Sequence, residues 1–272
     1  MQNPRVEFRF MLIAITRAVS PGIVNCELTF LARNPINLAT AQKQHQDYEM
    51  LLAKLGARII HLDEEPHLPD SMFVEDPAIV FDELAVICPL GTASRRVESA
   101  SIALALGKFR PLSYINLPGT MEGGDVLRIG RKVYVGRSTR TNDQGVRQLA
   151  AILAPHNYEV IPVAVTGCLH LKSAVTSLGD NTLLANRAWF DSAAMPTYDW
   201  IDVHPSEPHA ANALALGETI IFPASFPETR SRIAAPGFSV TAIDISELQK
   251  AESGLTCSSL LFEAPNPYPG IP

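Results

Sequence analysis

Residues 38–55 carry the clearest helical pattern of the chain. Apolar or half-apolar side chains recur there at the three- and four-residue intervals that mark one face of a surface helix. These positions are Leu38, Ala41, His45, Tyr48, Leu51, Leu52 and Leu55. Asn37 stands where an N-cap is expected, and Gly56 stands where such a helix ends. Residues 58–62 follow as an apolar, β-branched run before a turn-forming stretch, so we expect a buried strand there.

Short strand patterns and helical patterns alternate along the rest of the chain. Further strands are predicted at 10–15, 78–81, 85–88, 127–129, 132–136, 159–163, 182–185, 200–203, 219–222, 239–243 and 259–262. Further helices are predicted at 96–106, 143–153, 228–235 and 246–252. The rhythm of two short strands, a helix and another strand indicates an α/β protein. Because no linker-like tract interrupts it, we predict a single domain over residues 1–272.

The composition excludes several classes of protein. Of the 272 residues, 47% are hydrophobic and 18% charged, and 22 basic against 28 acidic residues give a net charge of −6. A disordered chain would need less hydrophobicity and more net charge. No apolar run approaches the roughly 18–20 residues that span a bilayer. The short run at residues 10–15 lacks a following cleavage pattern, so we interpret it as a strand rather than a signal peptide.

The composition and the motifs also limit which ligands and partners we expect the protein to bind. The charge is scattered and acidic, whereas nucleic acid requires a basic face, so we expect none to bind. The four cysteines at positions 26, 88, 168 and 257 show no CxxC spacing, which indicates free thiols in a reducing compartment such as the cytoplasm. No GxGxxG or GxxxxGK[ST] loop occurs, so no nucleotide cofactor is expected. The histidines show no HxH or HxxxH spacing, so no metal is expected either.

A carboxylate-rich segment, PDSMFVEDP, holds Asp70, Glu75 and Asp76 around an apolar run. Charged residues in such a place commonly end a strand in solvent. The alternative is a cluster at the mouth of a pocket, where carboxylates repel one another unless a cation joins them. A guanidinium suits that role, because its planar fork of N–H donors matches carboxylate oxygens in pairs.

Three further residues are candidates for chemistry. Glu122 begins EGGDV, where the two glycines indicate a turn or a close approach of the backbone. His170 alternates with leucines in CLHLKS, which we interpret as a strand carrying either a structural histidine or a catalyst. Cys257 lies in SGLTCSS, between a short predicted helix and a strand. It is either a small buried residue or one half of a Cys/His nucleophile pair.

Taken in order, LPDSMFVEDP, SRR, EGGDV, VGRSTRTN, LHLKS and GLTC resemble the dimethylarginine dimethylaminohydrolase (dimethylargininase) family. The resemblance runs from about residue 13 to residue 262. It implies the pentein fold of the guanidino-group-modifying enzymes, a five-bladed α/β propeller built from ββαβ units around a central active site. The strand and helix rhythm agrees with such units but does not by itself give the number five.

The resemblance also implies roles for individual residues. Cys257 would be the nucleophile, His170 the general acid and base, and Glu122 the carboxylate that orients His170. The implied substrate-binding residues are Leu28, Asp70, Glu75, Asp76, Arg95, Arg140 and Glu252. Among these, the resemblance implies guanidinium binding by the carboxylates of the VED motif and substrate-carboxylate binding by the two arginines. The chain departs from the family at Glu252, where Asp is usual, and at residues 88–91, which read CPLG rather than TRPG.

The implied activity is hydrolysis of Nω-methylated L-arginines to citrulline and a methylamine through a covalent S-alkylthiouronium on Cys257. Two alternatives remain: an arginine deiminase-like or citrulline-hydrolysing enzyme on the same fold, and a non-catalytic pentein that binds a partner. The expected partner is a small-molecule substrate, with a homodimer as one expected assembly. No membrane, nucleic acid, cofactor or metal is expected to take part.

Overall fold

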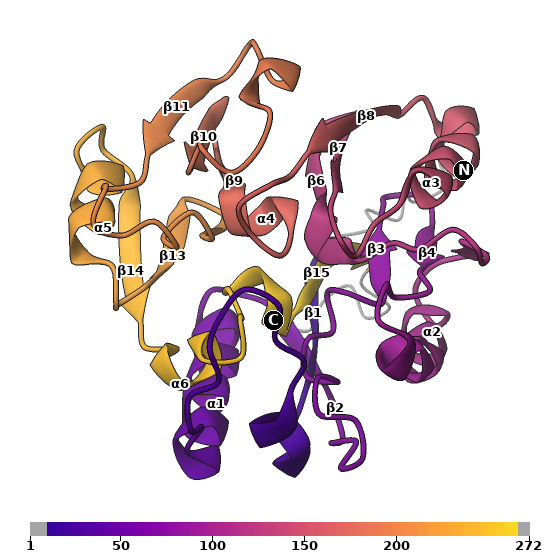
Figure 1. Cartoon of the computed structure of the whole chain (residues 1–272), viewed down its shortest axis with the longest axis horizontal. Helices are drawn as coiled ribbons and strands as arrows, with labels where there is room; N and C mark the ends of the chain where they lie inside the picture. Colours follow the sequence, from indigo (N-terminus) through magenta and orange to yellow (C-terminus); the bar gives the residue numbers. More distant parts are fainter. Residues whose placement is uncertain (1–9, 266–272) are drawn as a thin grey trace, which may run out of the picture.

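Five three-stranded sheets surround a common centre in residues 10–265, the part of the chain that the computed structural model describes (Figure 1). In chain order of their middle strands, the sheets are β15 (Leu260–Pro265), β1 (Phe10–Arg17) and β2 (Arg58–Leu62); β3 (Ala78–Val80), β4 (Ala85–Ile87) and β5 (Leu112–Tyr114); β6 (Val126–Ile129), β7 (Lys132–Arg137) and β8 (Glu159–Ala164); β9 (Val175–Gly179), β10 (Thr182–Ala185) and β11 (Asp199–Asp202); and β12 (Leu214–Leu216), β13 (Thr219–Pro223) and β14 (Ser239–Ile243). This arrangement confirms the predicted five-bladed α/β propeller.

Every sheet repeats one connection pattern. In each sheet the middle strand pairs antiparallel with one neighbour, and the chain crosses over from the middle strand to a neighbour on the other side that runs parallel to it. A parallel neighbour cannot follow through a tight turn, so a helix fills the crossover in most blades. The long crossover helices are α1 (Leu38–Lys54), α2 (Ser99–Leu106), α3 (Asp143–Leu153) and α5 (Pro227–Ala234). The fourth blade crosses over with only the 3₁₀ turn η5 (Ser192–Ala194).

The first blade closes the ring. Its strand β15 comes from the C-terminal end and pairs antiparallel with β1, in a register that places Ile13 opposite Phe262. The parallel strand β2 lies on the other side of β1. The ends of the described chain are therefore hydrogen-bonded into one sheet, which ties the last blade to the first.

Local sequence signals account for the helix ends. The Asn37 side chain accepts a hydrogen bond from the Thr40 amide at 2.9 Å, and Gly56 adopts a φ of 96° just beyond α1. The buried face of α1 includes Tyr48 and Leu52, so the predicted stripe is confirmed. Asn142 caps α3 in the same way, through the Gly145 amide at 2.9 Å.

Short elements account for most of the differences from the sequence predictions. The strands β5, β9 and β12 were not predicted, and they are only three to five residues long. The strand predicted through His170 is wrong, because the helical turn α4 (Leu171–Ala174) begins directly after this residue. The helix predicted at 246–252 is shorter, α6 (Ser246–Gln249), and Glu252 beyond it has a left-handed φ of 57°.

The remaining one-turn elements are η1 (Pro21–Asn25), η2 (Ala93–Glu98), η3 (Gly123–Asp125), η4 (Ala154–His156) and η6 (Thr256–Ser258). Two of these turns carry or adjoin predicted site residues: η3 directly follows Glu122, and η6 contains Cys257. Within residues 10–265, none of the helices is long and apolar enough to cross a membrane.

Candidate active site

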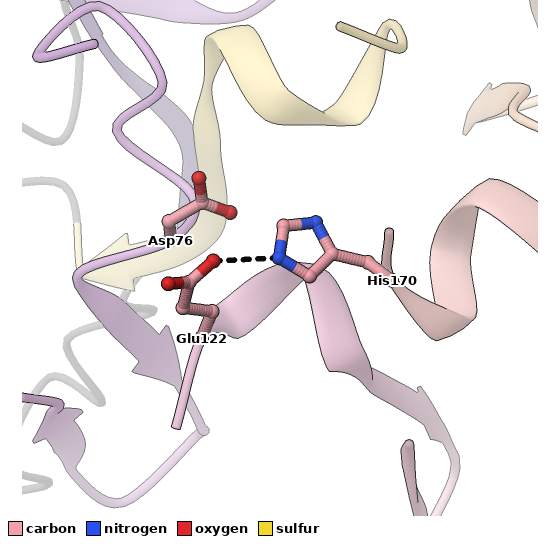
Figure 2. Close-up of side chains that lie close together, drawn as sticks. All are labelled: Asp76, Glu122 and His170. Carbon is pink, nitrogen blue, oxygen red and sulfur yellow. Dashed lines mark hydrogen bonds and ion pairs between the residues drawn. The ribbon is translucent and has the colours of Figure 1, made fainter. Parts of the chain in front are cut away.

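Glu122 and His170 form a buried pair (Figure 2). The His170 Nε2 and Glu122 Oε2 atoms are 2.6 Å apart, and the two residues are 4% and 0% exposed. The other oxygen of Glu122 accepts hydrogen bonds from the Gly91 amide at 3.1 Å and from Arg140 Nη1 at 3.3 Å. The carboxylate is thus fully engaged and fixed in orientation.

The two members of this pair shift each other's ionisation. Burial alone would lower the pKa of His170, but the charge of Asp76, the hydrogen bond to Glu122 and the charge of Asp125 raise it above the ordinary 6.5. Burial alone would raise the pKa of Glu122, but His170 and two nearby arginines lower it. Each group therefore favours the charged form of the other, and the pair is an ion pair at neutral pH.

The EGGDV motif positions His170 through contacts of Asp125 and Gly124. Asp125 is fully buried, and its carboxylate accepts hydrogen bonds from the Leu171 amide at 2.9 Å and the Ser138 hydroxyl at 2.6 Å. The first of these bonds starts α4 at the residue after His170, which is why the backbone turns here instead of continuing as a strand. At Gly124 a Cβ atom would lie 2.5 Å from His170 Nδ1, so the ring packs directly on glycine backbone.

Asp76 completes a three-residue cluster with this pair. One ligand atom of each of Asp76, Glu122 and His170 lies within 4.8 Å of the others, and Figure 2 shows the three side chains converging. The Asp76 Oδ2 atom accepts a hydrogen bond from Arg95 Nη1 at 2.9 Å. Its Oδ1 atom is buried and has no hydrogen-bond partner within residues 10–265. A buried carboxylate oxygen without a partner is costly, so this atom is suited to a donor supplied by a ligand.

The spacing of this cluster would also suit a metal ion, but its other contacts do not. Arg95 and Arg140 place guanidinium groups against the carboxylates of Asp76 and Glu122. The nitrogen of His170 nearest to Glu122 is already in a short ion pair. The donor set is therefore balanced by protein cations, which favours an organic cation with N–H groups over a metal.

Glu75 faces a different set of partners from its neighbour Asp76. One oxygen pairs with Lys172 Nζ, and the other accepts a hydrogen bond from the Thr256 hydroxyl at 2.9 Å. Both oxygens are engaged within the protein. Glu75 is thus hydrogen-bonded to Thr256, the residue before Cys257. The predicted contact of Glu75 with a guanidinium stays a prediction.

Cys257 lies in the 3₁₀ turn η6 and is partly exposed. Its Sγ atom accepts a hydrogen bond from the Gly254 amide at 3.3 Å, and its carbonyl accepts one from the Glu75 amide at 3.3 Å. Burial, together with the charges of Glu75 and Asp76, raises the pKa of the thiol to about 12. The resting residue is therefore a neutral thiol. Because Asp76 influences both Cys257 and His170, it links the two candidate catalytic groups electrostatically.

The two predicted arginines are buried and paired with protein carboxylates. Arg95 is 4% exposed, and it contacts Asp76 at 2.9 Å and Glu98 at 3.0 Å. Arg140 is 6% exposed and donates to Glu122 and, at 3.0 Å, to the Thr29 hydroxyl. Both are therefore held at the cluster, although the nearest partners that the structure gives them are protein groups.

Residues 27–31, here called the lid segment, are held by two of the predicted acidic residues. The Asp70 carboxylate accepts the Glu27 amide at 3.1–3.2 Å. The Glu252 carboxylate accepts the amides of Thr29, Phe30 and Leu31 at 2.5–3.1 Å. Leu28 lies between these anchor points and packs against the hydrophobic cluster around α1. Glu252, predicted to face the substrate, is thus hydrogen-bonded to lid backbone in this structure.

A cavity of about 240 Å³ lies beside the lid segment. It is lined by lid residues, by the loop before His170 and by the turn before Cys257, including Leu31, Cys168, Asn212, Glu252 and Gly254. Asp76, Glu122 and His170 do not line it. The cavity therefore adjoins the candidate site without containing the carboxylate cluster.

Comparison with known proteins identifies the family. A family model described as eukaryotic N,N dimethylarginine dimethylhydrolase matches residues 30–188. The N(G),N(G)-dimethylarginine dimethylaminohydrolase of Pseudomonas aeruginosa is 36% identical over 82% of this chain and 89% of its own length. The protein of the same name from Streptomyces coelicolor is 35% identical over 91% and 95% of the two chains. This chain belongs to the dimethylarginine dimethylaminohydrolase family.

Solved structures of this family match the whole propeller. A complex of the Pseudomonas aeruginosa dimethylarginine dimethylaminohydrolase with citrulline, made with a cysteine-to-serine variant, has a TM-score of 0.88 at 34% identity and covers 94% of this chain and 100% of its own. A dimethylarginine dimethylaminohydrolase adduct with S-methyl-L-thiocitrulline, made with a histidine-to-glycine variant, has a TM-score of 0.87 at 34% identity and covers 93% and 100%. The N-terminal domain of a cyanobacterial arginine dihydrolase has a TM-score of 0.84 at 18% identity, covers 92% and 97%, and shares the fold.

Three residues that were not predicted from the sequence also contribute to the candidate site. Asp125, Lys172 and Thr256 each contact a predicted site residue or its neighbour in the chain. All three lie inside the motifs that carry the family resemblance, and their place in these motifs is the feature of the sequence that could have marked them as site residues. Their roles depend on contacts between distant segments, which spacing in one sequence does not reveal.

Proposed function

We propose that this protein hydrolyses Nω-methylated L-arginines to L-citrulline and a methylamine. Membership of the dimethylarginine dimethylaminohydrolase family supports this activity, as do the names of the two bacterial relatives. Citrulline bound to one relative and the S-methyl-L-thiocitrulline adduct of another supply matching ligands. The observation that carries the proposal is the buried Asp76 carboxylate, with one oxygen unpaired among residues 10–265, beside the Glu122–His170 ion pair. That arrangement suits a planar cation with N–H donors.

Cys257 acts as the nucleophile and His170 as the general acid and base. The replacement of a cysteine in the citrulline complex and of a histidine in the S-methyl-L-thiocitrulline adduct supports these two roles. The neutral thiol must release its proton to solvent before attack, because His170 is already protonated in its ion pair with Glu122. A bound guanidinium offsets the charges of Glu75 and Asp76 that raise the pKa of the thiol, so substrate binding itself favours the thiolate.

The reaction then proceeds in two halves. The thiolate attacks the guanidinium carbon, and protonated His170 gives its proton to the methylated nitrogen as the carbon–nitrogen bond breaks. The methylamine leaves, and a cationic S-alkylthiouronium remains on Cys257. Neutral His170 takes a proton from water as the oxygen attacks the same carbon. The carbon–sulfur bond breaks to restore the thiolate, and the proton lost as the citrulline carbonyl forms is taken up by the released amine.

The proposed binding groups follow the distribution of charge. Glu75 and Asp76 are the proposed partners of the guanidinium, Asp76 through its unpaired oxygen and Glu75 beside its contacts with Lys172 and Thr256, while Glu122 orients His170. Arg95 and Arg140 are the proposed partners of the substrate carboxylate. Asp70, Glu252 and Leu28 complete the proposed site from the lid side.

The finer expectations about organisation and location are proposals of the same kind. We propose that residues 1–272 form one catalytic domain that takes a small-molecule substrate and pairs as a homodimer in the cytoplasm. One ring of five sheets supports the single domain, and the four free cysteines support a reducing compartment. Light scattering of the purified chain tests the dimer, and cell fractionation tests the location.

A panel of four compounds tests the activity. Asymmetric dimethylarginine, monomethylarginine, arginine and citrulline are supplied separately, and citrulline, ornithine and amine release are measured. We expect citrulline and the corresponding methylamine from the two methylated arginines. Turnover confined to arginine or citrulline would refute the proposal in favour of an arginine deiminase-like or citrulline-hydrolysing enzyme. An absence of turnover on all four would favour a non-catalytic binding protein.

A further inference from the structure

Asn212 is a buried asparagine between the strands β11 and β12, outside every motif that identified the family. It is 7% exposed. The Thr176 hydroxyl fixes the backbone on both sides of it, since it donates to the Ala211 carbonyl at 2.8 Å and accepts from the Ala213 amide at 3.1 Å. The side chain of Asn212 therefore projects from an immobilised stretch of backbone.

All the polar atoms of the Asn212 amide are used, and they are used between two elements. The Nδ2 atom donates to the Lys172 carbonyl at 3.0 Å and to the Thr256 hydroxyl at 3.1 Å. The Oδ1 atom accepts from the Thr256 amide at 3.1 Å. These contacts fix which end of the amide is oxygen and which is nitrogen, because in a flipped amide the oxygen would face two acceptors and the NH2 group would face the Thr256 N–H donor. A Cβ atom at Gly254 would overlap this amide, so the two surfaces are in close contact.

The two elements that Asn212 joins are those that carry the reacting groups. Lys172 stands two residues after His170 in the four-residue helix α4, and Thr256 directly precedes Cys257 in the three-residue turn η6. One-turn elements have little rigidity of their own. The Thr256 hydroxyl passes the chain of hydrogen bonds on to Glu75, which pairs with the side chain of Lys172. The Asn212 amide is thus part of a hydrogen-bond network that connects α4, η6 and Glu75.

We infer that Asn212 is a positioning residue that fixes the placement of Cys257 relative to His170. The inference rests on the roles proposed above for those two residues. Within residues 10–265 the hydrogen bonds of the Asn212 side chain go to Lys172 and Thr256 and to none of the predicted substrate-binding carboxylates or arginines, so its contribution lies in aligning the reacting groups and not in holding the substrate. A misplacement of about 1 Å at reacting atoms can cost about 100-fold in rate.

The decisive variant is Asn212→Asp, which keeps the shape and the acceptor but replaces two donors by a charged oxygen. We expect kcat for asymmetric dimethylarginine to fall about 100-fold while KM changes less than about threefold. The ratio of variant to wild-type kcat should rise as the pH is lowered from about 8 to about 5.5, because a protonated carboxyl regains one donor. Asn212→Ala has no such group, so its loss of kcat relative to wild type should not depend on pH.

The matched control is Asn186→Asp. The Asn186 amide likewise donates to a backbone carbonyl, that of Pro208 at 3.0 Å, and accepts a backbone amide, that of Ala188 at 3.3 Å. The Asn186 side chain therefore ties the same connecting stretch without bonding to α4 or η6, and the backbone amide of Asn186, which donates to the Ala174 carbonyl of α4 at 2.8 Å, is unchanged by the substitution. We expect its kcat to stay within about twofold of wild type. An equal loss in this variant, or an Asn212→Asp enzyme within threefold of wild type at every pH, would overturn the inference.

A second measurement separates this inference from the proposed function. The rate at which iodoacetamide alkylates Cys257, followed on its peptide by mass spectrometry, needs no substrate. We expect Asn212→Asp to change that rate by more than about threefold, since the new charge stands beside the turn of the thiol, and Asn186→Asp to leave it unchanged. If the wild type is inactive but Asn212→Asp still changes the alkylation rate, the proposed activity is refuted and the positioning role is not. Equal alkylation rates in wild type and Asn212→Asp would refute the positioning role.

Discussion

Replacing Glu122 by Gln tests the ion pair on which the candidate site is built. Gln has the same length and can still accept a hydrogen bond from His170, but it carries no charge. A hydrogen bond to a charged group contributes about 1.5–3 kcal/mol net, against about 0.5–1.5 kcal/mol for a neutral one. The 2.6 Å contact between His170 Nε2 and Glu122 Oε2 should therefore lose about 1 kcal/mol or more. Since about 1.36 kcal/mol corresponds to one pKa unit, the pKa of His170 should fall by about one unit.

The effect on stability should depend on pH in a defined direction. The pKa of His170 is raised from 6.5 on folding, so its contribution is complete below 6.5 and is lost as the pH rises through the raised value. The pKa of Glu122 is lowered from 4.5, so its contribution is complete above 4.5 and is lost as the pH falls through the lowered value. The stability deficit of Glu122→Gln should therefore be largest between these two ordinary values and should shrink on both sides.

Two assays check this prediction. Urea unfolding of wild type and variant from about pH 4 to about pH 9 gives the deficit in the free energy of unfolding. Nitrogen NMR of the His170 ring gives its titration midpoint. The control is Asp47→Asn, which breaks the exposed pair with Lys43 and should cost about 0.5 kcal/mol or less. A deficit that does not vary with pH, or an unchanged midpoint for His170, would show that the two residues are not coupled as the geometry indicates.

Two further substitutions separate binding from chemistry. Cys257→Ser should abolish turnover of asymmetric dimethylarginine while calorimetry still detects citrulline binding, because the acidic cluster is intact; residual turnover above about 1% of wild type would exclude Cys257 as the nucleophile. Gly124→Ala should lower kcat about 100-fold, since its Cβ would lie 2.5 Å from His170 Nδ1 and displace the ring. Its control is Gly107→Ala at the end of α2, where φ is −60°, and equal losses in both variants would contradict a specific effect on His170.

The fold could be predicted from the sequence where the pattern is long or capped. The α1 stripe with Asn37 and Gly56, and the cap of α3, are local signals that the structure confirms. Strands of three residues carry too few positions to show a period of two. The equally short β3 and β4 were predicted from their apolar runs, whereas β5 and β12 were missed. The closure of the ring by β15 and β1 joins the two ends of the described chain, and only the family resemblance implied it.

The candidate site could be predicted only as a set of residues, not as a set of contacts. The motifs named Asp76, Glu122 and His170, and the structure brings all three together. They could not show that His170 precedes a helical turn, because that turn depends on the Asp125 carboxylate from another blade. Nor could they show that Glu75 is engaged by Lys172, since pairing between segments far apart in sequence leaves no local pattern.

The lid segment shows why charge alone does not assign a substrate contact. Glu252 was expected to meet the substrate, yet three backbone amides of the lid segment already donate to its carboxylate. The α-ammonium group of an amino-acid substrate would have to compete with these bonds, and breaking them would release residues 29–31 from Glu252. Within the described residues the Asp70 carboxylate accepts the Glu27 amide alone, so its buried oxygens retain unused acceptor capacity. We therefore propose Asp70 as the partner of the substrate's α-ammonium group and Glu252 as the residue that holds the lid segment in place.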